Sequence, residues 1–253
     1  MDPLIIGITG VVVFLVLVLL GTWIGYAAAT VGLIGIVLVK GWEGMGGIAG
    51  YLPYSSTASF EFSVIPLFII MGYFAYYAGL SRDIFHATRQ WFGHFPGGLA
   101  IASVFGCAAF GAVCGSSTAA TVVMGKVAIP EMRRYNYDPK LATAAVAASG
   151  TMASMIPPSI VMVIYGVITQ QSIGRLLMAG YIPGLLEAIL YTAMIYVRCR
   201  RNPMLGAALA AASWKERLLS LKGTWSFLLL AGVILGGIYF GVFTPTEAGG
   251  AGA

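Results

Sequence analysis

Residues 96–130 read PGGLAIASVFGCAAFGAVCGSSTAATVVMGKVAIP and decide how the chain folds. This apolar stretch is about 35 residues long, whereas a single membrane-spanning helix needs about 20 residues. Its centre, Cys114-Gly115-Ser116-Ser117-Thr118, is small and polar. We therefore expect two half-length helices that meet at this centre. Together they would form a re-entrant hairpin with both feet on one side of a membrane.

Basic residues flank this stretch at both ends. Arg82 and Arg89 precede it, and Arg133, Arg134 and Lys140 follow it. Short loops that carry Lys and Arg stay on the cytoplasmic side of a membrane. Both feet are therefore predicted inside, which a hairpin allows and a single span does not.

The composition of the whole chain indicates a membrane protein. Of its 253 residues, 59% are apolar and 9% are charged, against about 25% charged residues in a soluble domain. The mean hydropathy is +0.90. The net charge of +5 does not indicate a nucleic-acid partner, because the basic residues lie between apolar runs and form no stripe interleaved with aromatics. A lipid bilayer is the expected surrounding.

The remaining chain predicts further spans and two kinds of connector. Residues 41–62 are rich in glycine and predict a loop with a short interfacial helix. Residues 81–94 predict an amphipathic helix in the plane of the membrane surface, with Ser81 as its N-cap. The other apolar runs predict full spans at residues 4–20, 23–39, 63–80, 141–168, 176–197 and 225–243.

These expectations combine into an all-α integral membrane protein with about six transmembrane helices, one re-entrant helical hairpin and one proline-broken helix. Loops at residues 81–95, 131–140 and 198–224 are predicted inside, and those at residues 41–62 and 169–175 outside. The chain divides into scaffold helices with an external loop, a span with the interfacial helix, a transport-domain half with the re-entrant hairpin and the broken helix, and a basic cytoplasmic loop with a last span and a truncated end. These four parts are residues 1–62, 63–95, 96–197 and 198–253.

The second broken segment is Ser154-Met155-Ile156-Pro157-Pro158-Ser159, inside the run 141–168. Pro158 cannot donate a backbone hydrogen bond, and it also pushes Pro157 away from helical geometry. In hydrocarbon every backbone polar group needs a partner, so a break is tolerated where protein buries it or where it lines a cavity. Freed carbonyls at such a break can bind Na⁺, and helix N-termini favour carboxylates. The alternative interpretation is a structural kink.

The first segment has a similar pair of interpretations. Gly115 permits a sharp turn, and the hydroxyls of Ser116, Ser117 and Thr118 can cap a helix or bind a ligand. The alternative is close helix packing by small residues. Glu187 lies within the run 176–197 and is a candidate functional carboxylate. A contact with another helix and a place beside a polar cavity remain open for it.

The chain shows no nucleophile–base set, metal-ligand cluster or phosphate-binding loop, so we expect a transporter and not an enzyme. In addition, a series of short motifs resembles the large membrane subunit of the tripartite ATP-independent periplasmic (TRAP) transporters, the DctM family. They are Pro66-Leu67-Phe68-Ile69-Ile70-Met71-Gly72, Pro96-Gly97-Gly98-Leu99-Ala100, Gly115-Ser116-Ser117, Ile129-Pro130-Glu131-Met132, Tyr137-Asp138-Pro139, Ile156-Pro157-Pro158-Ser159, Ala179-Gly180-Tyr181-Ile182-Pro183-Gly184 and Phe243-Thr244-Pro245-Thr246-Glu247-Ala248.

The resemblance implies a Na⁺-driven importer of organic acids such as dicarboxylates, in the bacterial inner membrane, with an elevator mechanism and no organic cofactor. Its implied partners are a small four-helix membrane subunit and a periplasmic substrate-binding protein. Its implied fold has two inverted repeats. The first hairpin tip would then lie at Gly115, Ser116, Ser117 and Thr118, facing a break at Ser154, Ile156, Pro157, Pro158 and Ser159, with Na⁺ near Ser116, Ser117 and Pro157.

Members of this family continue for a further half, with a second hairpin and a second broken helix. By that comparison, this sequence resembles a large subunit truncated after its first half. Two alternatives are kept: another ion-coupled anion carrier with the same hairpin architecture, and a membrane scaffold that does not transport.

Overall fold

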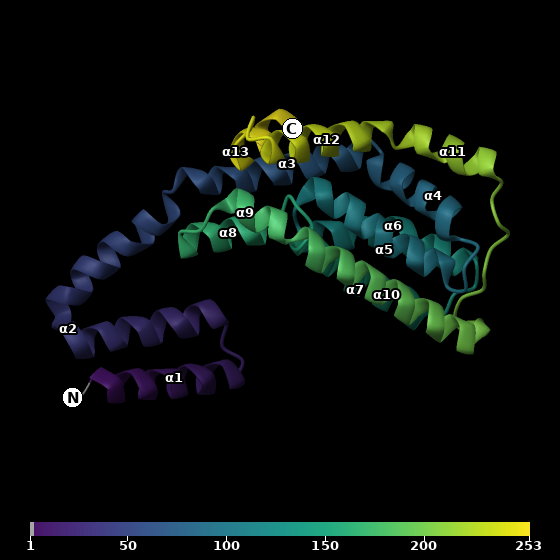
Figure 1. Ribbon diagram of the computed structural model, residues 1–253. Coiled ribbons are helices and arrows are strands. Elements are labelled where there is room, and N and C mark those ends of the chain that lie inside the picture. Colours follow the sequence, from purple (N-terminus) through teal and green to yellow (C-terminus); the bar gives the residue numbers. More distant parts are fainter. Residues whose placement is uncertain (1–2) are drawn as a thin grey trace. The chain divides into compact units, whose positions relative to one another are not determined.

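The computed structural model describes residues 3–253, apart from the side chain of Ser56. Every element in that part of the chain is helical, and it contains no strand (Figure 1). The predicted all-α class is therefore confirmed. The chain forms two compact units, Met1–Phe60 and Glu61–Ala253.

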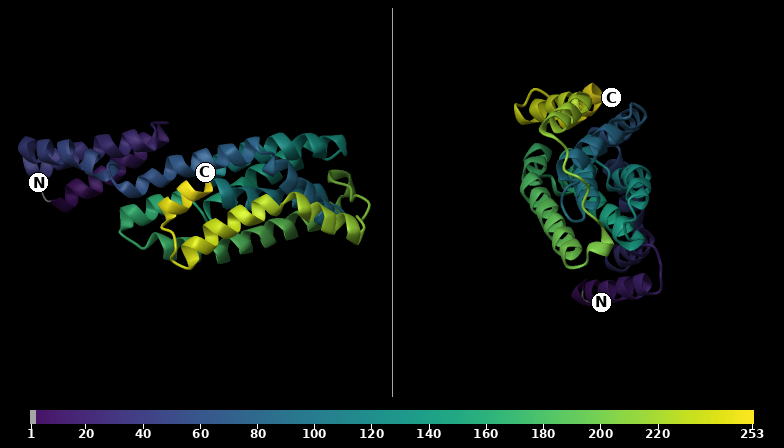
Figure 2. Two further views of the ribbon diagram at one scale, coloured as in Figure 1. Left: turned by 90° about the horizontal axis from the view of Figure 1, so that it is seen from above. Right: turned by 90° about the vertical axis from the view of Figure 1, so that its right-hand side faces the viewer.

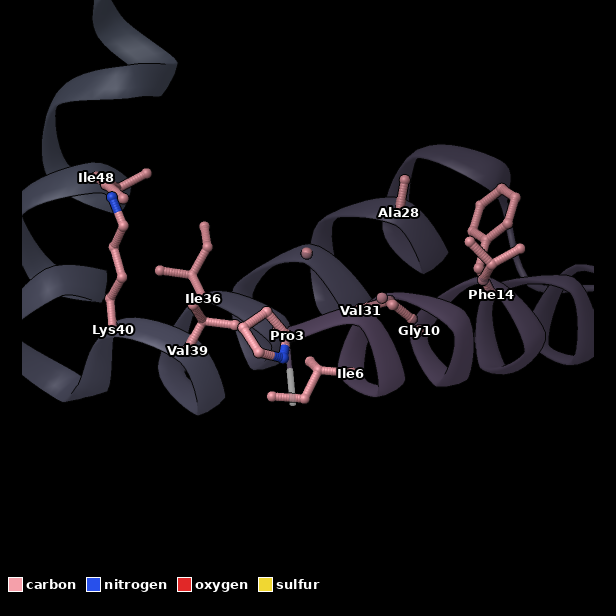
Figure 3. Close-up of a pocket in the computed structure, with 14 residues that line it drawn as sticks. Pro3, Ile6, Gly10, Phe14, Ala28, Val31, Ile36, Val39, Lys40 and Ile48 are labelled. Carbon is pink, nitrogen blue, oxygen red and sulfur yellow. The ribbon is translucent and has the colours of Figure 1, made fainter. Parts of the chain in front are cut away.

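The first unit is a pair of antiparallel helices, α1 (Pro3–Leu19) and α2 (Ile24–Thr57). They enclose an apolar groove, in which Phe14 lies near Ala28, and Lys40 and Ile48 lie toward the other end (Figure 3). The turn between α1 and α2 is tight, with Gly21 in the left-handed region at φ 87°.

The prediction of a loop at residues 41–62 is wrong over most of that range, because helix α2 continues to Thr57. Its only non-helical residue is Gly41, with φ 75° and ψ −179°, where two helical stretches meet at a kink. The other glycines of this stretch adopt helical angles, and Pro53 removes only one backbone hydrogen bond. The glycine-rich composition therefore indicated a loop, whereas the structure has a helix with one kink at Gly41.

The second unit contains the remaining helices, apart from Phe60, the first residue of η1. In chain order they are η1 (Phe60–Ser63), α3 (Val64–Tyr77), α4 (Leu80–Phe92), α5 (Gly98–Cys114), α6 (Ser117–Arg134), α7 (Pro139–Gly150), η2 (Thr151–Ser154), α8 (Ile160–Thr169), α9 (Ile173–Ala179), α10 (Tyr181–Arg201), η3 (Pro203–Leu205), α11 (Trp214–Gly223), α12 (Trp225–Tyr239) and α13 (Pro245–Gly252).

Helix α5 forms the centre of this unit. It contacts α3, α4, α6, α7, α10 and α12, and most of its residues are buried. Small residues explain this central place, since Gly106 and Gly111 let neighbouring helices approach closely. A Cβ at Gly111 would lie 2.5 Å from the Cβ of Ala153. The two further views in Figure 2 show how the other helices pack around it.

Three helical stretches are long and apolar enough to cross a membrane: Ile24–Ser55, Phe60–Tyr77 and Ile173–Arg201. The bent pair Trp214–Gly223 and Trp225–Tyr239, with 58° between its helices, would make a fourth. Shorter apolar helices include α1 and α8. The chain is thus a multi-pass helical membrane protein by composition and length, while six spans stay a prediction.

Three local predictions are corrected. The N-cap of the amphipathic helix is Gly79, with φ 85°, and Ser81 is buried in the first turn of α4. The basic loop at residues 198–224 contains a helix, α11, started by the capping box of Ser213 and Glu216. The sequence after Thr244, expected only as an end, forms α13 through an equivalent capping box with Glu247.

Candidate functional site: a hairpin tip on a broken helix

The predicted hairpin is confirmed as two antiparallel helices, α5 and α6, joined at Gly115 and Ser116 (Figure 1). Gly115 adopts a φ of 63°, which an L side chain rarely adopts, and so reverses the chain in two residues. Ser116 then caps α6, because its Oγ accepts a hydrogen bond from the Ala119 amide at 3.3 Å. The arms have 17 and 18 residues, so they are about 26 Å long and not half-length.

Both feet of the hairpin are tied to the same short segment after α10. The amide of Gly97 donates to the carbonyl of Gly206 at 3.0 Å, and the amide of Asp138 donates to the carbonyl of Leu205 at 2.9 Å. The Tyr137 hydroxyl accepts from the Leu99 amide and donates to the carbonyl of Ala207. Burial raises the pKa of Tyr137 to about 12, so this hydroxyl keeps its proton. Both feet therefore lie at one end of the unit.

The second arm is also fastened to the amphipathic helix. Arg89 of α4 forms an ion pair with Glu131 of α6, and its guanidinium also donates to the Tyr135 hydroxyl at 2.7 Å. The same guanidinium lies 5.2 Å from the centre of the Tyr135 ring. One arginine thus makes three contacts with the C-terminal end of α6.

The predicted break is confirmed between α7 and α8. Helix α7 ends at Gly150, the 3-10 turn η2 follows, and α8 begins at Ile160. Ser159 caps α8, since its Oγ accepts from the Met162 amide at 3.3 Å and donates to the carbonyl of Ser154 at 2.6 Å. Pro157, Pro158 and Ser159 are buried. The two prolines at the centre of the break are therefore covered by protein, whereas Met155 is exposed.

The hairpin tip touches the break directly. The Ile160 amide, at the start of α8, donates to the carbonyl of Gly115 at 3.1 Å. A Cβ at Gly115 would lie 2.9 Å from the carbonyl oxygen of Pro158, so only glycine fits without a shift. Two segments more than 40 residues apart in sequence therefore meet at their non-helical centres.

The break leaves backbone acceptors without protein partners. In the described part of the chain, no backbone or side-chain donor reaches the carbonyl oxygens of residues 155–158. Hydroxyls from Ser116, Ser154 and Ser159 belong to the same region. Carbonyl and hydroxyl oxygens are the ligands that hard cations use in transporter sites with broken helices.

Glu187 contacts the helix that carries the break, which answers one of the two possibilities left open by the sequence. The Thr151 hydroxyl and the Tyr191 hydroxyl each lie 2.8 Å from Oε1 of Glu187. Thr151 is the first residue of η2, and its carbonyl accepts from the Ser154 hydroxyl at 2.6 Å. The Glu187 carboxylate on α10 is thus linked through Thr151 and Ser154 to the start of the break. Neither Thr151 nor Tyr191 was predicted, because no local pattern marks them.

A cavity of about 430 Å³ lies beside the hairpin tip, between α3 and α6. Ser116 and Thr118 line it at the tip, and Tyr73, Tyr76 and Lys126 line it further along. The Lys126 ammonium lies 5.9 Å from the centre of the Tyr76 ring. Small-molecule sites are typically of this size, mostly apolar, with a few polar groups.

The predicted site residues do not all converge. Gly115 lies against Pro158 and the start of α8, in agreement with the expectation that the hairpin tip faces the break. Thr118 is exposed and lines the cavity, whereas Ile156 packs on α10, where a Cβ at Gly184 would lie 2.7 Å from its Cγ1. The carbonyl of Ser117 accepts from Thr121 within α6 at 2.8 Å.

A helical hairpin whose tip lies on a proline-broken helix is typical of the class of membrane transporters with discontinuous helices. Within that class, residues 11–253 match the family described as "Tripartite ATP-independent periplasmic transporter, DctM component". The chain belongs to this family.

Several curated relatives support this assignment. The C4-dicarboxylate TRAP transporter large permease protein DctM of Pseudomonas aeruginosa is 39% identical over 196 residues, which are 77% of this chain and 45% of the relative. The sialic acid TRAP transporter large permease protein SiaM of Vibrio cholerae is 36% identical over 75% of this chain and 44% of the relative. The ectoine TRAP transporter large permease protein TeaC of Halomonas elongata is 34% identical over 93% and 55%.

The chain spans about half the length of these relatives. All three are named as permeases and not as enzymes, in agreement with the expected class of protein. Their named solutes differ, so family membership alone does not select a solute.

Proposed function

We propose that this chain supplies a hairpin and a broken helix to the large permease of a Na⁺-coupled TRAP importer of organic acids in a bacterial inner membrane. The contact between the Gly115 carbonyl and the Ile160 amide carries the proposal, because it brings the two non-helical centres together. Freed backbone carbonyls beside serine hydroxyls favour a cation at this point.

The proposed Na⁺ position is near Ser116, Ser117 and Pro157. A carbonyl and two hydroxyls match the preference of a hard cation for neutral oxygen ligands. Binding of Na⁺ would offset the unsatisfied carbonyls of the break and hold tip and break together. Release of Na⁺ would weaken that contact, which links occupancy of the ion site to the shape of the hairpin tip.

The proposed solute is a small organic acid. The named solutes of the three relatives are a C4-dicarboxylate, sialic acid and ectoine, and each of these molecules carries a carboxylate. The cavity beside the tip suits such a solute, because Lys126 supplies a positive charge and the tyrosines supply flat apolar surface. A small membrane subunit and a periplasmic binding protein are the proposed partners, and an elevator motion between inverted repeats is the proposed mechanism.

Uptake into proteoliposomes tests the proposal. The chain is assembled with the remainder of a large permease, a small subunit and a binding protein, and uptake of succinate, sialic acid and ectoine is measured with and without a Na⁺ gradient. We expect uptake of at least one of these solutes only with Na⁺ and binding protein present. Uptake without the binding protein favours another ion-coupled anion carrier, and absence of both uptake and ²²Na⁺ binding favours a scaffold.

The variant Ser116→Ala/Ser117→Ala tests the ion site. We expect the affinity for ²²Na⁺ to fall by about tenfold or more, because the variant loses two hydroxyl ligands. Loss of the Ser116 cap is controlled by Ser213→Ala, which removes the cap of α11 with the same 3.3 Å distance between hydroxyl and amide. Unchanged Na⁺ dependence in the double variant would exclude the tip as a Na⁺ ligand.

A further inference from the structure

A groove runs between α7 and α10, near the end of the unit that holds the hairpin feet. It encloses about 330 Å³. The groove exists because α7 presents small side chains, Ala144, Ala145 and Ala148, toward α10, which leaves space that larger residues would fill. An unfilled apolar groove in a membrane protein forfeits dispersion contacts, so a matching apolar chain gains them on entry.

The mouth of the groove is basic. Lys140 and Arg198 line the groove itself, and Arg198 also lines a second, more open cavity of about 470 Å³, together with Arg201. No ion pair joins these three side chains to a carboxylate in the described part of the chain. Asp138 lines the groove as well, and its Oδ1 accepts from the Leu141 amide as the cap of α7.

The apolar wall continues along α10 beyond the groove. Met194 lines both cavities, and Leu190 and Leu186 follow it at intervals of four residues on the same face. Each of the three is more than half exposed. The surface therefore combines a cluster of three cations with an apolar track that leads away from it along a predicted membrane span.

We propose that this groove is a binding site for one anionic phospholipid, with the phosphate at Lys140, Arg198 and Arg201 and an acyl chain along Ala144, Ala148 and α10. A free anion would use only the basic mouth, and a neutral lipid only the apolar track. Basic pockets between membrane helices on the cytoplasmic side bind anionic headgroups. The site is independent of the proposed transport activity.

Native mass spectrometry of the purified chain, released from mixed phosphatidylglycerol and phosphatidylcholine bicelles, tests the site. We expect the wild-type chain to retain one phosphatidylglycerol in preference to phosphatidylcholine. In Lys140→Gln/Arg198→Gln/Arg201→Gln the affinity falls on the order of 100-fold, since each basic side chain near an anionic lipid contributes about fivefold. A wild-type chain without headgroup preference overturns the proposal, and this result needs no variant to fold.

A matched control removes the same charge elsewhere. Arg133 and Arg134 end α6, and Lys222 lies in the last turn of α11; all three are exposed and line neither cavity. The variant Arg133→Gln/Arg134→Gln/Lys222→Gln is expected to retain phosphatidylglycerol like the wild type. An equal loss in both triple variants would mean general attraction between a basic protein and an anionic lipid, and would overturn a defined site.

A third variant separates a lipid from a free phosphate. Ala144→Leu/Ala148→Leu fills the groove and keeps every charge, so we expect it to lose the retained lipid. Inorganic phosphate at millimolar concentration is expected to displace little lipid from the wild type. Retained lipid in the filled groove, together with displacement by inorganic phosphate, would show an anion site without an acyl-chain groove and would contradict the proposal.

Discussion

The Ile160 amide donates to the carbonyl of Gly115 across 3.1 Å, joining the start of α8 to the tip of the hairpin. This bond connects two segments that leave helical geometry for different reasons, a left-handed glycine in one and consecutive prolines in the other. The first amides of a helix have no acceptor within that helix, and the turn exposes the Gly115 carbonyl, which accepts from the Ile160 amide. The bond fixes the hairpin tip against the break.

The substitution Gly115→Ala is expected to destabilise the unit by about 2–3 kcal/mol, from the left-handed backbone and the clash with Pro158. Gly79→Ala is the control, since Gly79 also has a positive φ, 85°, but its added Cβ would meet nothing within 4 Å. We expect about 1 kcal/mol for the control. Reversible unfolding in mixed micelles measures both, and equal losses would show that the contact with the break contributes nothing.

A double-mutant cycle of Thr151→Val and Glu187→Gln is expected to give a coupling of about 1 kcal/mol, the usual range for side-chain hydrogen bonds between membrane helices. Thr143→Val provides the matched control. The Thr143 hydroxyl donates within its own helix, to the carbonyl of Pro139 at 2.8 Å. Its cycle with Glu187→Gln should show no coupling. A zero value for Thr151 in the same unfolding assay would contradict the link between α10 and the break.

Removal of Arg89 is expected to loosen the second hairpin arm. The side chains of Arg89 and Glu131 are 28% and 22% exposed, so screening limits the pair to about 1 kcal/mol. This corresponds to a Tm lower by about 2–4 °C for a chain of this size. Arg89→Lys should recover only part of the loss, because an ammonium cannot reproduce the fork that reaches both Glu131 and Tyr135.

Arg82→Gln serves as the control for that measurement, since Arg82 is an exposed residue in the first turns of the same helix. It should leave the Tm unchanged. Complete recovery by Arg89→Lys would instead indicate that charge alone holds the arm.

The capping box of α13 predicts an acidic pH dependence. Hydrogen bonds from the Thr244 amide and hydroxyl lower the pKa of Glu247 from its ordinary value of 4.5. The stabilisation of α13 is therefore present above that value and is lost as the pH falls through the lower pKa of the folded protein. A carbon-13 NMR titration of the carboxyl group in detergent measures this pKa. Thr244→Val should return it toward 4.5, and an unchanged pKa would separate Glu247 from the cap.

The basic ends of the hairpin region and the glycine-serine centre predicted the reversal between α5 and α6 correctly, because these signals are local, although the arms are longer than the predicted half-length helices. A left-handed glycine and a helix-capping serine act within two residues, so they can be recognised from adjacent letters. The proline break was predicted for the same reason. The capping boxes at Ser213 and Thr244 are equally local signals, and they start the two helices α11 and α13 that were not predicted from the sequence.

Residues 41–57 and Ser81 show where local reasoning failed. Glycine-rich composition indicated a loop, yet the backbone stayed helical with one kink at Gly41. Ser81 has the chemistry of an N-cap, but Gly79 took that place and Ser81 became buried in the first turn of α4. In both cases neighbouring helical geometry overrode the residue preference.

The sequence by itself determined that the chain is a helical membrane protein with one reversal at Gly115 and one break at Pro157-Pro158, because apolar length, glycine and proline act on their own neighbourhood. Only the tertiary structure decided that the reversal rests on the break, that Glu187 holds Thr151, and that alanines on α7 leave a groove with a basic mouth. These contacts join residues far apart in the chain, and packing of whole helices selects them.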